Sequence, residues 1–221
     1  MEEKMIHIVI DLEMNPIKRD LKEIRQYLMD EVIEIGAVKL DENFQMIDEF
    51  QSYVKPNYGK ISKHITKLTG ITDADVAEKN YFPEAFQKFF EWIGTWDMKI
   101  YSWSNSDINQ LKNECAYKIP EFDIAKLESQ WIDLQKCFDD KIGISTNLAL
   151  KHAIGAMDKN FEGTQHTALA DAANTAAILM IIQDDETFNK IMKPVIDMLN
   201  PHELSQSIGD LYPELMNLKF D

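Results

Sequence analysis

The stretch IHIVIDLE, residues 6–13, is the part of the sequence that predicts most about the fold. Its first five residues are mostly apolar and β-branched, which is typical of a strand buried inside a sheet. The stretch ends in two acids, Asp11 and Glu13, and the two-residue period of a strand directs both side chains to one side of the sheet. Such a pair repels unless a cation lies between its members. A D-x-E pattern can also end a strand in water, and taken alone it favours that simpler interpretation.

The segments that follow predict a mixed α/β sheet with helices on its faces. The strand-like segments are 6–12, 32–40, 44–54, 99–103 and, in a more ambiguous region, 131–134. The second and third of these flank the turn-like segment 41–43 and are expected to form a hairpin. Helices are predicted over 62–68, 73–78, 83–93, 106–116, 147–154 and 168–182. The polar segment 17–29 is also compatible with a helix.

Composition bounds the class of protein. The chain has 221 residues, of which 45% are hydrophobic, enough for a full core. It contains no apolar run long enough to span a membrane and no signal-peptide pattern at its start. Two cysteines, Cys115 and Cys137, make neither a disulfide framework nor a zinc site. These features predict a cytoplasmic protein with reduced thiols and no membrane partner.

The net charge of −15 argues against binding to long nucleic acids, because phosphates repel an acidic surface. The charge is uneven, however. Segment 55–67, KPNYGKISKHITK, contains four lysines and no acid. His64, with the neighbouring Lys60, Lys63 and Lys67, could therefore meet a phosphate backbone. The other histidines, at positions 7, 152 and 202, are expected to be structural or solvated.

Three more polar residues stand at the boundaries of predicted elements. Asp107 follows the strand 99–103 after a short loop, and taken alone it is better interpreted as a cap of the next helix. His166 and Asp171 are five residues apart, a poor spacing for one helix face. The geometry works better if His166 lies in the loop that enters a helix and Asp171 lies about one turn inside, with Thr167 as a possible cap. An acid in an otherwise apolar helix is costly to bury without a partner, and a metal would be such a partner.

Together these five residues suit the hydrolysis of a phosphodiester bond. Two divalent ions about 4 Å apart can hold the attacking water and the leaving group. Carboxylate oxygens suit Mg²⁺ or Mn²⁺. A histidine can accept the proton of the attacking water near neutral pH.

Three motifs in the same order resemble those of the DEDDh exonucleases of the ribonuclease H-like fold, the family of RNase T, oligoribonuclease and the proofreading subunit of bacterial replicative polymerase. The motifs are IVIDLE at 8–13, YSWSNSD at 101–107 and HTALADA at 166–172. The segments EIGAV at 34–38 and LTGIT at 68–72 also look like family sequences, so the resemblance covers roughly residues 6–182. Within the family, the chain looks most like the branch that trims RNA 3' ends and includes the KapD-type proteins labelled sporulation inhibitors.

The resemblance implies a ribonuclease H-like, mixed five-stranded sheet with helices on both faces. Residues 1–185 would form the exonuclease domain. The tail beyond it contains three prolines but many apolar residues, so we expect 186–221 to be a helical C-terminal extension packed on that domain; a disordered tail is the alternative. The implied activity is metal-dependent 3'→5' hydrolysis of single-stranded ends, RNA before DNA. A non-catalytic binding regulator of the same fold is a further alternative, and the sequence does not determine the oligomeric state.

The resemblance also implies a role for each site residue. Asp11, Glu13 and Asp171 would bind a first divalent cation, Asp11 and Asp107 would hold a second, and His166 would be the general base. The remaining expected contacts are to substrate. Met14 and Asn15 would lie beside the 3'-terminal nucleotide. The residues that would wall the base or touch the sugar or next base are Leu68, Gly70, Ile71, Trp103 and Asn105.

Overall fold

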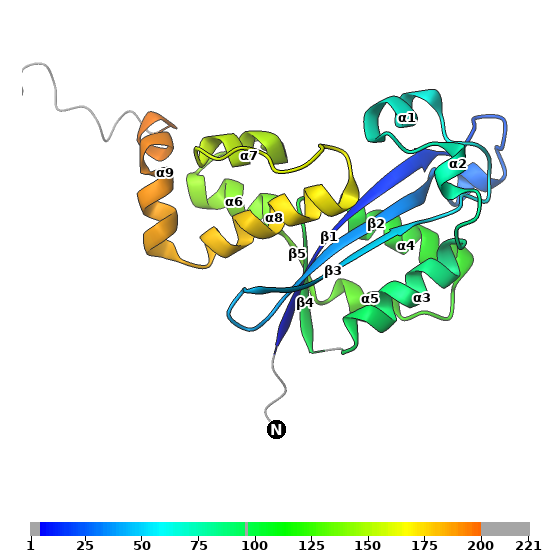
Figure 1. Ribbon diagram of the computed structural model, residues 1–221, viewed down its shortest axis with the longest axis horizontal. Helices are drawn as coiled ribbons and strands as arrows, with labels where there is room; N and C mark the ends of the chain where they lie inside the picture. Colours follow the sequence, from blue (N-terminus) through cyan, green and yellow to red (C-terminus); the bar gives the residue numbers. More distant parts are fainter. Residues whose placement is uncertain (1–4, 96, 200–221) are drawn as a thin grey trace, which may run out of the picture.

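The computed structural model describes residues 5–95 and 97–199, and its centre is a five-stranded sheet (Figure 1). The strands, in spatial order, are β3 (Met46–Tyr53), β2 (Asp30–Leu40), β1 (Ile6–Pro16), β4 (Met98–Ser102) and β5 (Trp131–Asp133). Strands β3, β2 and β1 are antiparallel, whereas β4 and β5 run parallel to β1. The predicted hairpin and mixed sheet are therefore confirmed.

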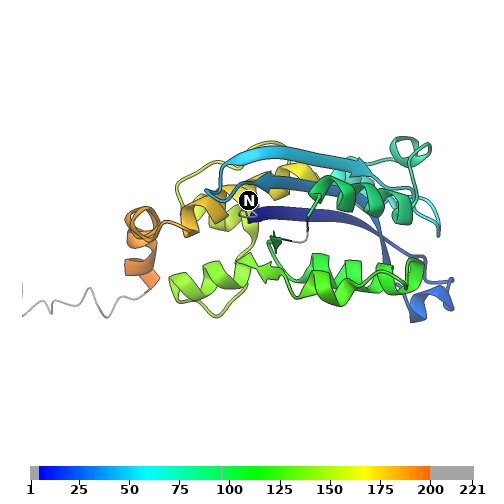
Figure 2. The same ribbon diagram turned by 90° about the horizontal axis from the view of Figure 1, so that it is seen from below.

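Helices cover both faces of this sheet, as predicted. They are α1 (Lys63–Thr69), α2 (Asp73–Val76), α3 (Phe82–Ile93), α4 (Ser106–Lys118), α5 (Ile124–Glu128), α6 (Leu134–Ile142), α7 (Leu150–Ala156), α8 (Ala168–Ile182) and α9 (Asp185–Leu199). Helices α3, α4 and α5 lie on one side of the sheet and α8 on the other (Figures 1 and 2). Side chains alternate along β1 accordingly. Ile8 and Ile10 pack in the core with α3 and α4, and Val9 packs in the core with α6 and α8.

Strand β1 is longer than the sequence indicates, and its extra length positions the acids. It pairs with β2 as far as Pro16 opposite Asp30. Its pairing with β4 ends earlier, at Val9 opposite Tyr101. Asp11 and Glu13 thus lie inside a strand that has β2 on one side and, among the described strands, no partner on the other. This is the point at which the sheet opens.

The composition of segment 17–29 is compatible with a helix, but the structure has no α-helix there. It contains a single 3-10 turn, η1 (Ile24–Gln26), within a compact connection between β1 and β2. The ladder continues into it through Ile17 N, which donates to Met29 O at 2.9 Å. Because the two strand ends are held together and both Ile17 and Leu28 are buried, the chain must turn back before a longer helix can form.

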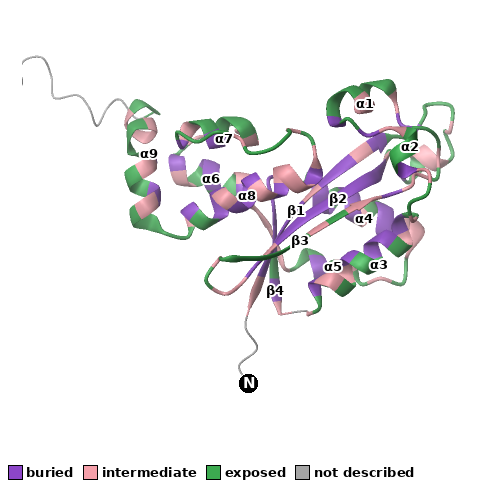
Figure 3. Cartoon of the chain, viewed as in Figure 1, coloured by how far each residue is buried: buried purple, intermediate pink, exposed green. Residues whose placement is uncertain are grey.

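Helix α9 extends the helical layer. Its Phe188 and Met192 are buried in the core that also contains α6 and α8, while its outer side is exposed (Figure 3). The remainder of the expected C-terminal extension, 200–221, lies outside the described residues. Over the described part of the chain, the helices are too short or too polar to cross a membrane.

Candidate active site

The face of β1 that carries Val9 also carries the two acids. Val9, Asp11 and Glu13 alternate with the core residues Ile10 and Leu12, so all three point toward the layer that contains α8. Glu13 is buried, with 8% of its surface exposed, and Asp11 is half-buried. Strand periodicity therefore places both carboxylates beneath one helix.

Helix α8 comes close to the sheet at its first residues because β2 has a glycine there. A Cβ atom on Gly36 would stand 2.1 Å from Leu169 N and 2.2 Å from the carbonyl carbon of Ala168. Two residues earlier on the same face, the buried Glu34 accepts a hydrogen bond from Ala168 N at 3.1 Å and another from Gln51 Nε2 at 2.6 Å. The start of α8 is thus fixed on β2, directly opposite Glu13, which is the cross-strand partner of Glu34.

His166 reaches the site through a tight turn just before α8. Its φ of 64° lies in the left-handed region, which costs free energy for a residue with a side chain. Two hydrogen bonds hold the turn: His166 N donates to Asp171 Oδ2 at 3.3 Å, and Thr167 Oγ1 donates to Thr164 O at 2.9 Å. The predicted placement of His166 in the entering loop and Asp171 one turn inside the helix is confirmed.

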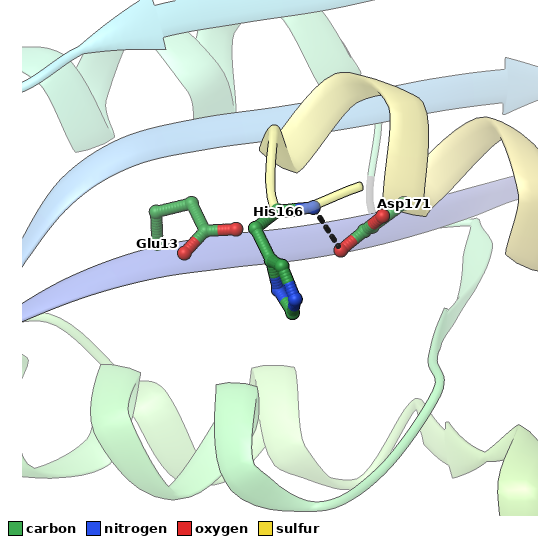
Figure 4. Close-up of side chains that lie close together, drawn as sticks. All are labelled: Glu13, His166 and Asp171. Carbon is green, nitrogen blue, oxygen red and sulfur yellow. Dashed lines mark hydrogen bonds between the residues drawn. The ribbon is translucent and has the colours of Figure 1, made fainter. Parts of the chain in front are cut away.

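Glu13, His166 and Asp171 form the tightest group of the site (Figure 4). One ligand atom from each lies within 4.8 Å of the others. The residues come from β1, from the turn and from α8, so three separate elements must be in place to form the group. Within the described structure, the buried Asp171 Oδ1 has no hydrogen-bond partner.

Asp107 approaches from the opposite side of β1. It lies in the first turn of α4, is buried, and accepts a hydrogen bond from Leu12 N at 3.0 Å. The helix begins after Asn105 and not after Asp107, so the interpretation of Asp107 as its cap does not hold. The carboxylate instead occupies the open edge of β1 beyond the end of its pairing with β4.

The charges of these acids interact strongly. Burial, followed by the charges of Asp107, Asp171, Glu13 and Glu34, raises the pKa of Asp11 well above its usual range. Burial and the charges of Asp171, Glu34 and Asp107 raise the pKa of Glu13 to about 8. Burial raises the pKa of Asp107 to about 7, against the hydrogen bond from Leu12 N, and burial also raises that of Asp171. Protons or cations must therefore accompany this cluster at neutral pH.

The donor set fits a divalent cation. Carboxylate oxygens are the ligands that Mg²⁺ and Mn²⁺ prefer, and in the described structure the buried Asp171 Oδ1 accepts no hydrogen bond. Binding a cation would offset the repulsion among the carboxylates that, together with burial as the larger cause, raises the pKa of Glu13. The residues present are thus suited to the metal ions that the sequence predicts.

The residues expected to contact substrate divide into exposed and buried ones. Leu68, 41% exposed, together with Gly70 and Asn105, lies on the surface, and Met14 is half-buried. The structure places three others differently: Asn15, Ile71 and Trp103 are buried.

Physical reasons account for these three. Asn15, 3% exposed, donates through Nδ2 to Lys60 O at 3.3 Å and accepts from Ser62 N at 2.8 Å. Trp103 packs against Phe138 and donates to Leu148 O at 3.0 Å. Ile71 belongs to a small core with Ile33 and Val76. These contacts hold the three side chains in the interior of the protein.

Two features of the site were missed at the sequence level. Glu34 is one, and its signal was present: a glutamate inside an otherwise apolar strand needs a buried partner. The other is a cavity of about 260 Å³ next to His166 and Asp171. Its further lining residues include Lys151, His152, Phe161 and Gln165. His152, expected to be structural or solvated, is exposed at this cavity.

Comparisons with known proteins agree with this geometry. The family model RNase_T, described as an exonuclease, matches residues 8–179. The protein named probable 3'-5' exonuclease KapD of Bacillus subtilis is 27% identical over 188 residues, which cover 85% of this chain and 89% of that protein. The 3'-5' exoribonuclease 1 of Rattus norvegicus is 25% identical over 174 residues, 70% of this chain and 47% of the relative, so this chain spans about half of its length.

A solved structure shows the same fold. The nuclease domain of 3'hExo, described as a DEDDh family member bound to rAMP, superimposes with a TM-score of 0.69 at 22% identity. The match covers 83% of this chain and 94% of that domain. The predicted ribonuclease H-like architecture is confirmed by this likeness.

Proposed function

Since this chain belongs to the RNase T family of 3'→5' exonucleases, we propose that it removes nucleotides from single-stranded 3' ends of RNA. The observation that supports the site assignment is the convergence of Glu13, His166 and Asp171, one ligand atom of each lying within 4.8 Å of the others. Asp11 and Asp107 adjoin this group closely enough for their charges to interact with it. All five residues of the expected set thus take part in one electrostatic cluster.

Two divalent cations, Mg²⁺ or Mn²⁺, would supply Lewis-acid activation and neutralise charge on the phosphoryl oxygens and the leaving oxygen when bound. Asp11, Glu13 and Asp171 would hold one of them, and Asp11 with Asp107 the other. The fixed positions of these carboxylates on β1, α4 and α8 mean that little side-chain entropy is lost on binding. Glu34 remains behind the ligands as a hydrogen-bonded support for α8.

His166 is the proposed general base. In the reaction, a bond forms between the water oxygen and the phosphorus of the terminal linkage, and the bond from that phosphorus to the O3' of the preceding nucleotide breaks. His166 accepts the proton that the water loses, and the leaving oxygen gains one from solvent. The turn at His166 brings its ring to Glu13 and Asp171, while its exposed position keeps it in contact with solvent.

The walls of the site suit a terminal nucleotide. Leu68 and Gly70 present an apolar edge and open backbone at the end of α1. The cavity beside His166 adds Phe161 on the other side. We assign the base to the α1 side, with Met14 and Asn105 nearby, and assign Asn15, Ile71 and Trp103 to positioning these walls. Residues up to 185 would form the catalytic unit, and α9 with the chain that follows would be its extension.

The deciding experiment is a time course on single-stranded RNA and DNA of matched sequence, each labelled at the 5' or the 3' end, with Mn²⁺ and with EDTA. Metal-dependent shortening from the 3' end, faster on RNA, is the expected result. Faster loss of DNA would assign the activity to DNA instead. Folded protein that binds but cleaves neither strand, and whose Asp11→Asn variant behaves identically, would indicate a binding regulator.

A further inference from the structure

The exposed side chains of Lys60, Lys63, His64 and Lys67, which we name the α1 basic surface, form a positive region on an acidic protein. The whole chain carries a net charge of −15, yet 55–67 contains no acid. The outer side of α1 is open to solvent (Figure 3). The positive charge of this segment is therefore opposite in sign to the net charge of the protein.

These lysines have little other electrostatic role. Among residues 5–95 and 97–199, no ion pair includes Lys63 or Lys67. Lys60, 84% exposed, only approaches Asp73 at 4.0 Å, and the other oxygen of Asp73 accepts from Ile61 N. An exposed pair at that distance contributes almost nothing. Lys63 and Lys67 are four residues apart on one helix face, where they repel each other slightly until an anion binds.

The α1 basic surface is attached to the strand that carries the catalytic acids. Asn15 follows Glu13 by two positions on β1, and its amide bonds both to Lys60 O and to Ser62 N. Ser62 in turn caps α1 by accepting from Ile65 N at 3.2 Å. Movement of α1 relative to the acids would break these hydrogen bonds, so the backbone of α1 keeps a defined position relative to β1.

The helical period places Leu68, the proposed contact of the terminal base, on the same exposed side of α1 as the lysines. Ile65 and Thr69 face the body of the protein. The exposed side of α1 then runs from Leu68 through His64 to Lys67 and Lys63. A strand whose last base lies against Leu68 would carry its preceding phosphates across His64 toward the lysines.

We propose that the α1 basic surface binds the phosphates upstream of the scissile linkage, so that the enzyme prefers oligonucleotides to dinucleotides. The proposal rests on the proposed function, because it takes the 3' end to be at the carboxylate cluster. Lysines recognise phosphate as point charges and read no base, which suits an enzyme that must advance along any sequence.

The test compares a Lys63→Gln/Lys67→Gln variant with a Lys88→Gln/Lys190→Gln control, which removes the same charge from exposed sites on α3 and α9. Three substrates are used: a dinucleotide, a short single-stranded oligonucleotide, and the same oligonucleotide with uncharged methylphosphonates upstream of a normal scissile linkage. Each phosphate contact to a single strand contributes about 0.7 to the slope of log binding affinity against log salt concentration. Losing two contacts should therefore lower the affinity at ~0.1 M salt roughly 25-fold, relative to the affinity at ~1 M salt.

The expected result is that the ratio of kcat/KM for oligonucleotide over dinucleotide falls roughly 25-fold in the α1 variant and stays at the wild-type value in the control. Wild type and α1 variant should cleave the methylphosphonate substrate equally. An unchanged ratio, or an equal loss on all three substrates, would overturn the proposal. If the wild type cleaves none of them with Mn²⁺, the proposed function fails instead. In that case, fluorescence anisotropy measures how oligonucleotide affinity depends on salt concentration in the wild type and in both double variants. A salt dependence that is the same in all three proteins also overturns the proposal.

Discussion

The carboxylate of Asp107 accepts a hydrogen bond from the backbone N of Leu12 at 3.0 Å, although the two residues are 95 positions apart. Leu12 lies between Asp11 and Glu13, in the part of β1 that has lost β4 as a partner. One side chain therefore has two roles: it satisfies a buried backbone donor, and it places a fourth carboxylate against the other three. The same bond orients α4 relative to the strand.

Asparagine and alanine at position 107 should separate these roles. Asp107→Asn keeps an acceptor for Leu12 N but removes the charge, so we expect an unchanged or slightly higher melting temperature without metal and at least a hundredfold loss of kcat. Asp107→Ala also leaves the buried donor unsatisfied, which costs about 1–3 kcal/mol. Thermal unfolding and single-turnover kinetics measure the two effects. Equal melting temperatures for both variants would show that the bond contributes nothing to stability.

A methyl group at position 36 should displace the start of α8. Gly36→Ala would set its Cβ against the backbone of Ala168 and Leu169, which cannot move as a flexible side chain can. We expect kcat to fall at least tenfold together with a loss of stability on the order of 1–3 kcal/mol. Gly155→Ala is the matched control, because Gly155 lies in helix α7 and, apart from the backbone of that helix and the neighbouring residues, no described atom lies within 4 Å of the added Cβ. That variant should be as stable as wild type or more so. Full activity in Gly36→Ala would mean that the close approach does not position the site.

Local patterns in the sequence were sufficient for the main elements and for the place of His166 and Asp171 at the start of a helix. The run before Asp11 predicted a buried strand, and the spacing from His166 to Asp171 predicted a loop followed by a helix turn; both are present. Each of these depends on residues near one another in the chain.

Features that depend on distant residues were not predictable in this way. Segment 17–29 is compatible with a helix, yet pairing of Pro16 with Asp30 closes it into a short connection. Asn15 looks like a surface residue next to the acids until the loop before α1 folds over it. The role of Glu34 exists only once Ala168, 134 positions later, presents its N–H group.

Replacement of His166 should test its role as a base against a role as a ligand. Asn tolerates the left-handed region better than other side chains, so His166→Asn should preserve the turn held by Asp171. If His166 is the base, kcat falls by about 10²–10⁴-fold while Mn²⁺ affinity, followed by isothermal titration calorimetry, changes little. His166→Ala should lower kcat as much as His166→Asn does, and it should also lower the stability of the protein. A large loss of Mn²⁺ affinity in His166→Asn would instead make the ring a ligand, consistent with its place within 4.8 Å of the carboxylate oxygens.

Stability without metal should fall as the pH rises. The pKa of Glu13 is raised from 4.5 to about 8 and that of Asp107 from 3.8 to about 7, so between these limits the native state binds more protons than the unfolded chain. Stability then decreases with pH across the window from about 4 to 8, and the penalty is complete above pH 8. A penalty of a few kcal/mol lowers the melting temperature by about 5–10 °C.

A divalent cation binds the deprotonated carboxylates, so added Mn²⁺ should raise the melting temperature far more at pH 8 than at pH 5. Differential scanning calorimetry measures how the melting temperature changes with pH in the chelated and in the metal-loaded protein. Glu13→Gln is the control, because it removes a titrating group from the buried cluster and should flatten the pH dependence of the chelated protein. A chelated protein whose stability rises from pH 5 to pH 8 would contradict the raised pKa values. An equal effect of Mn²⁺ at both pH values would place the ion away from these acids.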